Sequence, residues 1–156
     1  KLSVIWFKGR CIMGVHSLGH DVLKLRNLDR SVPFYREVSR LKQVGLHGEK
    51  MVFFSIVDNH HDLAFLETDK SAISSLEESP GLHRVAFNVL DSLEVLKEAK
   101  DWLLNKGVEA DGVRDHVAIQ SVCFFDPDGN QIDLFVEGNS EIWHKNPSAV
   151  AKSKPL

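Results

Sequence analysis

The stretch Leu18-Gly19-His20-Asp21-Val22-Leu23-Lys24-Leu25 has a counterpart later in the chain, Leu82-His83-Arg84-Val85-Ala86-Phe87-Asn88-Val89. Both stretches mix apolar and polar residues in the way that is typical of half-buried strands. Each contains a histidine near its start, His20 in the first stretch and His83 in the second. The repetition predicts two similar units in which His20 and His83 occupy matching places.

A helix and three further strands are expected after each of these stretches. In the first half, Asp29 is the expected N-cap of a helix through Ser31–Ser39, with Pro33 in its first turn. In the second half, Asp91 or Ser92 begins a helix that runs to about Gly107. The expected strands are Val44–Leu46, Met51–Val57, Leu63–Glu67, Val117–Phe125 and Gln131–Val136, the last two joined by the turn sequence Asp126-Pro127-Asp128-Gly129-Asn130.

Two copies of such a unit favour pairing about a pseudo-two-fold axis rather than a solenoid. We therefore expect an α+β fold in which two paired βαβββ modules form an open, cupped mixed β-sheet with helices outside. The expected modules span residues 16–69 and 80–137 and form one combined domain. Residues 1–15 are an expected N-terminal extension, in which residues 1–12 are either an upstream extension or a non-native addition and Met13 is the expected natural start. Residues 138–156 are an expected surface tail anchored by Trp143.

Composition limits the classes of function. The chain has 156 residues, of which 43% are hydrophobic, and this is enough to build one core. A net charge of −3 argues against a nucleic-acid partner, because phosphate binding requires clustered Lys and Arg. No apolar run approaches the roughly 20 residues that span a bilayer. The two cysteines, Cys11 and Cys123, do not form a disulfide framework, which favours reduced thiols and a cytoplasmic location.

Two histidines and one aspartate are candidate metal ligands. If the modules pair, His20 and His83 can converge in the cleft between them. Asp133 lies between Ile132 and Leu134 in an expected strand, where an unpartnered acid would be costly to bury. Two histidines and a carboxylate are the ligand set of non-haem Fe(II) oxygenases. The alternative is that each histidine is exposed or hydrogen-bonded and that Asp133 faces solvent.

The chain also resembles the vicinal oxygen chelate superfamily, which includes glyoxalase I, fosfomycin and bleomycin resistance proteins, and extradiol ring-cleavage dioxygenases. The resemblance covers about residues 16–137. It implies paired βαβββ modules with a metal in the cleft, held by His20, His83 and Asp133. The matching segments are Leu18-Gly19-His20, Asn27-Leu28-Asp29-Arg30-Ser31, Phe34-Tyr35 and Phe125-Asp126-Pro127-Asp128-Gly129-Asn130-Gln131-Ile132-Asp133-Leu134.

Further segments resemble the single-domain extradiol dioxygenase-like proteins. Asn59-His60-His61-Asp62-Leu63-Ala64 is similar to a dioxygenase segment that carries an acid–base histidine, which implies that role for His61. Asp115-His116 with Ser121 is similar to a pattern of the same group, so His116 is a second catalytic candidate. The tail Ile142-Trp143…Asn146-Pro147-Ser148 resembles tails of this group as well.

Two positions depart from the family pattern. Asp133 stands where the family usually has Glu, and Cys123 stands where extradiol enzymes usually carry a Tyr hydroxyl. A thiol is a weaker hydrogen-bond donor than a phenol. We expect Cys123 and Phe87 to contact the substrate.

The expected function is a metal-dependent, extradiol-type dioxygenase that cleaves a catechol-like aromatic diol with O₂. The expected metal is Fe(II), with Mn(II) or another divalent metal as alternatives, and the expected assembly is a homodimer or higher homo-oligomer. A glyoxalase-type lyase or isomerase, a thiol transferase and a non-catalytic drug-binding protein are the rival functions. Ala64 aligns with Asp133, so the fourth ligand of glyoxalase I is missing, which favours the dioxygenase.

Overall fold

The computed structural model describes residues 17–39, 41–74, 79–89, 92–146, 148 and 154–155. The expectations for residues 1–12, including Cys11 and the first residues before Met13, lie outside this part of the chain. The first half contains β1 (Asp21–Leu25), α1 (Leu28–Ser39), β2 (Lys42–His47), β3 (Met51–Ser55) and β4 (Leu63–Glu67). The second half contains β5 (Arg84–Asn88), α2 (Leu93–Asn105), β6 (Arg114–Asp115), β7 (Ile119–Phe125) and β8 (Gln131–Glu137), followed by α3 (Ser140–Lys145) and β9 (Lys154–Pro155).

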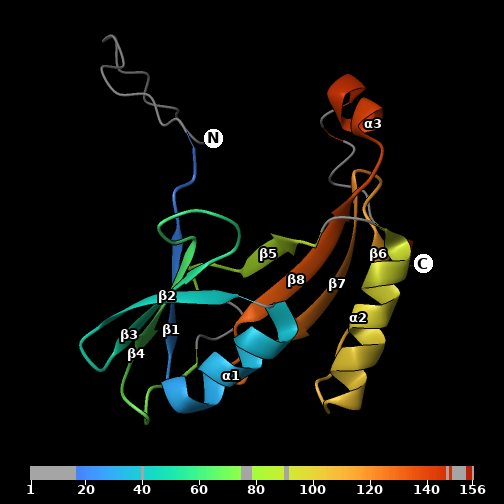
Figure 1. The fold of residues 1–156 in the computed structure, drawn as a ribbon. Helices are drawn as coiled ribbons and strands as arrows, with labels where there is room; N and C mark the ends of the chain where they lie inside the picture. Colours follow the sequence, from blue (N-terminus) through green and yellow to red (C-terminus); the bar gives the residue numbers. More distant parts are fainter. Residues whose placement is uncertain are drawn as a thin grey trace, which may run out of the picture.

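The strands form two mixed sheets, with orders β1-β4-β3-β2 and β5-β8-β7-β6-β9. In each sheet the first strand of the module pairs in parallel with the last, and the last pairs antiparallel with the strand before it. Helix α2 flanks the second sheet, and α1 lies between the first sheet and the near end of β8 (Figure 1). The expected α+β class and the two βαβββ units are confirmed.

Helix α1 begins earlier than the sequence pattern predicted, at Leu28. The side-chain oxygen of Asn27 accepts a hydrogen bond from the backbone N–H of Arg30 at 3.1 Å. The carbonyl of Asn27 accepts from the N–H of Ser31, also at 3.1 Å. Asn27 is therefore the N-cap, and the assignment of that role to Asp29 is wrong. Asp29 instead lies in the first turn, where its charge favours the helix dipole.

One hydrophobic core joins the two modules. Its largest fully buried side chains include Tyr35 of α1, Phe65 of β4 and Phe124 of β7. The rings of Tyr35 and Phe65 lie 4.4 Å apart between centroids, and Phe34 approaches Phe124 at 6.2 Å. Because α1 contributes aromatic contacts to both modules, the packing of this helix fixes how the two sheets sit relative to each other.

The turn between β7 and β8 is bound to α1 through its two aspartates, which are both buried. Asp128 accepts hydrogen bonds from Arg26 (2.9 Å), Arg30 (2.8 Å) and the hydroxyl of Ser31 (2.8 Å). Asp126 accepts from the hydroxyl of Tyr35 at 2.8 Å. The turn between β7 and β8 thus also connects the two modules through polar contacts.

The segment after β8 is more ordered than the sequence pattern predicted. Asn139 caps α3 by accepting a hydrogen bond from the N–H of Glu141 at 2.9 Å. Beyond α3, strand β9 pairs antiparallel with β6 at the edge of the second sheet. The expected anchoring by the Trp143 side chain lies outside what the structure describes. None of the helices in the described residues has the length and apolar character needed to cross a membrane.

Candidate functional site on the two strand faces

The pairing register defines which residues of the two modules are equivalent. Val22 of β1 pairs with Ala64 of β4, and Ala86 of β5 pairs with Asp133 of β8. Leu63-Ala64-Phe65 corresponds to Ile132-Asp133-Leu134, since both segments lie in the last strand of a module beside the first strand. Val22 is therefore equivalent to Ala86, and both are exposed on the open face of their sheets.

Counting back from this pair shows that His20 is equivalent to Arg84 rather than to His83. The predicted match of His20 with His83 is wrong by one residue, and His83 corresponds to Gly19. Strand β5 begins at Arg84, and His83 lies just before it as an exposed residue. A one-residue shift matters because successive side chains of a strand point to opposite faces.

Arg84 forms an ion pair with Asp133. The Nε of Arg84 lies 3.2 Å from Oδ2 of Asp133. The Asp133 side chain is only 3% exposed, whereas the Arg84 side chain is 44% exposed. The other carboxylate oxygen, Oδ1, is buried and has no hydrogen-bond partner. The carboxylate is thus neutralised by one cation from the neighbouring strand.

Cys123 lies directly opposite Asp133 in the β7–β8 pair. Its Sγ accepts a hydrogen bond from the side-chain amide of Gln131 at 2.8 Å. Burial raises the pKa of the Cys123 thiol to about 11, and a hydrogen bond to Asp133 and the charge of Asp133 add to this, although the hydrogen bond from Gln131 opposes it. The thiol is therefore protonated at neutral pH, which does not suit a nucleophile.

The first module carries a group of histidines on the loop before β4 and at the start of β1. The ring of His61 lies 4.4 Å from that of His20 and 4.5 Å from that of His60, measured between centroids. Phe53 meets His61 edge-on at 5.1 Å. The Nδ1 atoms of His60 and His61 are 2.6 Å apart. His61, which the sequence singled out, therefore contacts His20.

The surroundings of His61 favour the neutral form of its imidazole. Its partial desolvation and the nearby imidazoles of His20 and His60 lower its pKa, and the opposing effect of Asp62 is smaller. Asp62 is itself held by the backbone N–H of Ile56 (2.8 Å) and the side chain of Asn59 (3.0 Å), and these hydrogen bonds lower the pKa of Asp62. A neutral imidazole can accept a proton from a bound ligand.

The predicted metal ligands do not come together within the chain. Among the described residues, no three or more His, Cys, Asp or Glu side chains are gathered so that they could hold a metal ion. The two modules place His20 and Ala64 of the first module at positions equivalent to Arg84 and Asp133 of the second. Of these four residues, only His20 and Asp133 can ligate a metal. Arginine is not a metal ligand, since it stays protonated. The residues present do not fit the metal that the superfamily resemblance implies, and the set His20, His83 and Asp133 stays a prediction.

The other predicted site residues are dispersed. Phe87 pairs with Leu134, so it lies on the opposite face of the sheet from Asp133 and Cys123. Phe87 and Cys123 therefore do not share one face, contrary to the expectation that both contact one substrate. His116 lies in the loop between β6 and β7, where its backbone N–H donates to the carbonyl of Ile119 at 2.8 Å. Its catalytic role stays a prediction.

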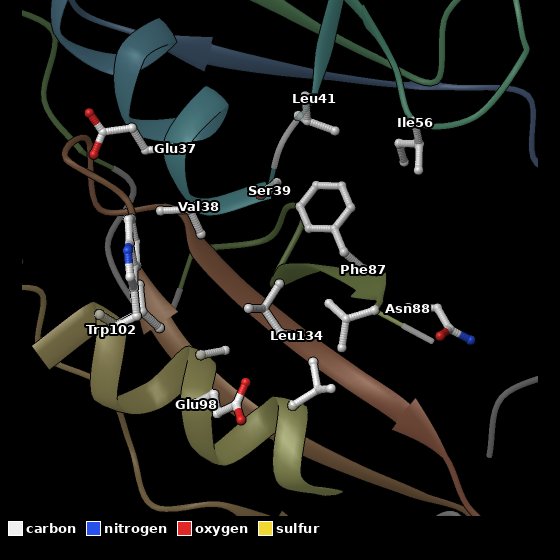
Figure 2. A pocket seen from close by; sticks show the side chains of 14 residues that line it. Glu37, Val38, Ser39, Leu41, Ile56, Phe87, Asn88, Glu98, Trp102 and Leu134 are labelled. Carbon is white, nitrogen blue, oxygen red and sulfur yellow. The ribbon is translucent and has the colours of Figure 1, made fainter. Parts of the chain in front are cut away.

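Phe87 instead lines a cavity of about 490 Å³ that the sequence did not predict. Figure 2 shows Phe87 and Leu134 facing the end of α1, with Trp102 of α2 on the far side. The cavity lies on the helix-covered side of the second sheet, between α1 and α2. Both apolar and polar residues from widely separated segments form it, which explains why no local pattern could show it.

Comparison with known proteins assigns the family. The model of the glyoxalase/bleomycin resistance protein/dioxygenase superfamily matches residues 17–134. This chain belongs to that superfamily, as the sequence resemblance indicated.

A curated relative points to one branch. The chain is 30% identical over 133 residues to a catechol-2,3-dioxygenase of Bacillus subtilis (strain 168). The match covers 83% of this chain and 44% of the relative, so the chain spans less than half of the relative's length.

Solved structures share the fold at low identity. A glyoxalase/bleomycin resistance protein/dioxygenase domain from Frankia sp. EAN1pec superposes with a TM-score of 0.65 at 20% identity, over 80% of this chain and 99% of the other. A genomically encoded fosfomycin resistance protein from Listeria monocytogenes gives a TM-score of 0.66 at 19% identity, over 85% and 99%. These likenesses establish the fold alone.

Proposed function

We propose that this chain binds a catechol-like aromatic diol and that His61 accepts a proton from one ligand hydroxyl. The observation that carries the proposal is the packing of His61 against His20 (4.4 Å) and Phe53 (5.1 Å). Phe53 gives an aromatic ligand a ring to pack against, and the neutral imidazole beside it gives the hydroxyl an acceptor. The relationship to a catechol-2,3-dioxygenase supports the ligand class.

Binding of catechol to the full chain, measured by calorimetry, tests this proposal. We expect saturable binding that His61→Ala weakens severalfold or more, because the hydroxyl loses its acceptor. His47→Ala is the matched control, since His47 is an exposed histidine on β2. Absence of catechol binding by the unaltered chain, or equal binding by His61→Ala, would contradict the proposal.

Ring cleavage by O₂ is the second candidate function, and the identity to a catechol-2,3-dioxygenase favours it. It would require a divalent metal, with Fe(II) first and Mn(II) as an alternative, held by His20, His83 and Asp133. A metal held there would supply one centre at which the diol and O₂ could both bind. Since the residues do not fit this metal within one chain, we derive no step of the reaction from the geometry.

Oxygen uptake decides this second candidate. Protein incubated anaerobically with Fe(II) and then given catechols and O₂ should consume oxygen and form coloured ring-cleavage product if the dioxygenase proposal holds. Loss of oxygen uptake in Asp133→Ala would support Asp133 as the third metal ligand. No uptake in a sample that demonstrably contains iron would remove the dioxygenase proposal and leave the binding proposal in place.

A homodimer is proposed, and light scattering on the purified chain tests it. A cytoplasmic location rests on the two cysteines expected to stay reduced. Glyoxalase-type chemistry and thiol transfer have no observation in their favour here. A non-catalytic binding protein is favoured by one specific contact, the ion pair between Arg84 and Asp133.

A further inference from the structure

Arg84 lies on the open face of the second sheet, at the position equivalent to His20 in the first module. Its ion-pair partner on the neighbouring strand is the buried Asp133. From this substitution we infer that the face is a metal-free site in which the guanidinium of Arg84 binds an anionic oxygen of an aromatic ligand. The choice of an aromatic diol as the ligand rests on the proposed function. The inference that Asp133 holds no metal is independent of it.

Charge disfavours a metal at this position. A guanidinium stays protonated throughout the accessible pH range and donates hydrogen bonds only. With its Nε 3.2 Å from Asp133, Arg84 already supplies the positive charge that a buried carboxylate needs. A divalent cation on Asp133 would have to displace Arg84 or lie close to a like charge, and either would weaken binding.

The same guanidinium is available to a ligand. Its side chain is 44% exposed, and a guanidinium has five N–H groups, more than one carboxylate oxygen can accept. These donors match the oxygens of a carboxylate or an ionised diol.

Residues beside Arg84 suit an aromatic ring. Arg84, Gln131 and Phe125 lie side by side on neighbouring strands β5, β8 and β7, so their side chains share one face. Phe125 is 59% exposed although it is a large apolar residue. Strands lie about 4.8 Å apart, which puts Phe125 about 10 Å from Arg84 along the row. Gln131 occupies the middle of the row, so a ring would lie over Gln131, with Phe125 on one side and the cation of Arg84 on the other.

The first experiment measures binding of 4-nitrocatechol to the full chain stripped of metal with a chelator. We expect 1:1 binding that Arg84→Met weakens by about ten-fold or more, as for loss of a charged hydrogen bond, while Arg84→Lys keeps part of the affinity. Arg36→Met is the control, because Arg36 is an exposed arginine of α1. Thermal unfolding of each variant shows that it is folded. Equal affinity in Arg84→Met would overturn the inference and leave the proposed function intact.

The second experiment titrates the same proteins with Co(II) and follows its visible absorption. We expect the unaltered chain to show no metal site that depends on Asp133. Arg84→His restores a donor at the position equivalent to His20 and should bind Co(II) at least about ten-fold more tightly. One equivalent of Co(II) bound by the unaltered chain and lost in Asp133→Asn would overturn the inference. If no form binds 4-nitrocatechol, the proposed function fails, and the cobalt titration still decides whether the site is metal-free.

Discussion

Arg84 neutralises Asp133 across strands β5 and β8, with 3.2 Å between its Nε and the carboxylate Oδ2. The pair joins a buried acid to a half-exposed base. In the first module the equivalent positions hold His20 and Ala64, so the two modules have diverged at the same place in the fold. This relationship explains how an acid on the last strand is tolerated without a metal.

The first prediction concerns the stability of this pair. Arg84→Met leaves the buried Asp133 without its cation and should lower the free energy of unfolding by about 1–3 kcal/mol. Combining it with Asp133→Asn should recover much of that loss, because the uncompensated charge is removed. Urea unfolding of the two single variants and the double variant measures the coupling. Additive losses would mean that the two side chains do not interact.

The second prediction concerns Asp128, which binds α1 to the β7–β8 turn. Burial alone would raise its pKa, but hydrogen bonds from Arg26, Ser31 and Arg30 outweigh this and lower the pKa. A lowered pKa in the folded state stabilises the fold above the unfolded value of about 3.9, and this stability is lost as the pH falls through the folded pKa. Asp128→Asn should therefore destabilise the protein by about 1–3 kcal/mol at pH 7.

The pH dependence separates this effect from a general packing loss. The unaltered chain should lose the contribution of Asp128 below about pH 4, whereas Asp128→Asn has no such contribution to lose. The difference between their unfolding free energies should shrink toward low pH. A difference that stays constant from pH 7 to acid would assign the loss to packing. Asp101→Asn is the control, since Asp101 is an exposed acid in the interior of α2.

The third prediction concerns the reactivity of Cys123. With its pKa raised to about 11, the thiol should alkylate slowly at pH 8 and faster only as the pH nears that value. Peptide mapping after iodoacetamide treatment, in a Cys11→Ser background, gives the rate at this site. Asp133→Asn should speed the reaction, because the charge of Asp133 contributes to the shift. Rapid alkylation of the folded chain at pH 7 would contradict the assignment.

The fourth prediction concerns Val117, which has a positive φ of 68° in the loop that follows His116. A β-branched residue is strained in this region, whereas glycine adopts it freely. Val117→Gly should therefore stabilise the protein by about 1 kcal/mol, after allowance for the greater backbone entropy of glycine in the unfolded chain. Thermal unfolding tests this. A clear loss of stability would show that the Val117 side chain contributes more through packing than the backbone strain costs.

Much of the fold could be predicted from the repeat in the sequence, because apolar spacing and turn residues report local structure directly. The strands around Asp133 and the turn Asp126-Pro127-Asp128-Gly129-Asn130 lie where the pattern put them. The N-cap was misplaced by two residues, since both Asn27 and Asp29 are good capping residues and only the backbone geometry distinguishes them.

The site was harder to predict because it depends on register. The pattern of Leu82–Val89 is compatible with a strand that begins at either His83 or Arg84, and pairing with β8 decides between them. The pattern favoured His83 as the functional residue, because histidine is a common metal ligand. Counting back from Ala86, the residue opposite Asp133, would have identified Arg84. The cavity beside Phe87 combines α1, β5 and α2, so only the packed structure could show it.

The most direct test of the central claim is the absorption spectrum of 4-nitrocatechol mixed with metal-free protein, at a pH where the free diol is mostly un-ionised. We predict a saturable shift to the spectrum of the ionised diol, with its proton released to the buffer, because the guanidinium of Arg84 stabilises the anionic oxygen. The shift should be lost in Arg84→Met and kept in Arg36→Met. A spectrum that changes only after Fe(II) is added, and only when Asp133 is present, would contradict the account.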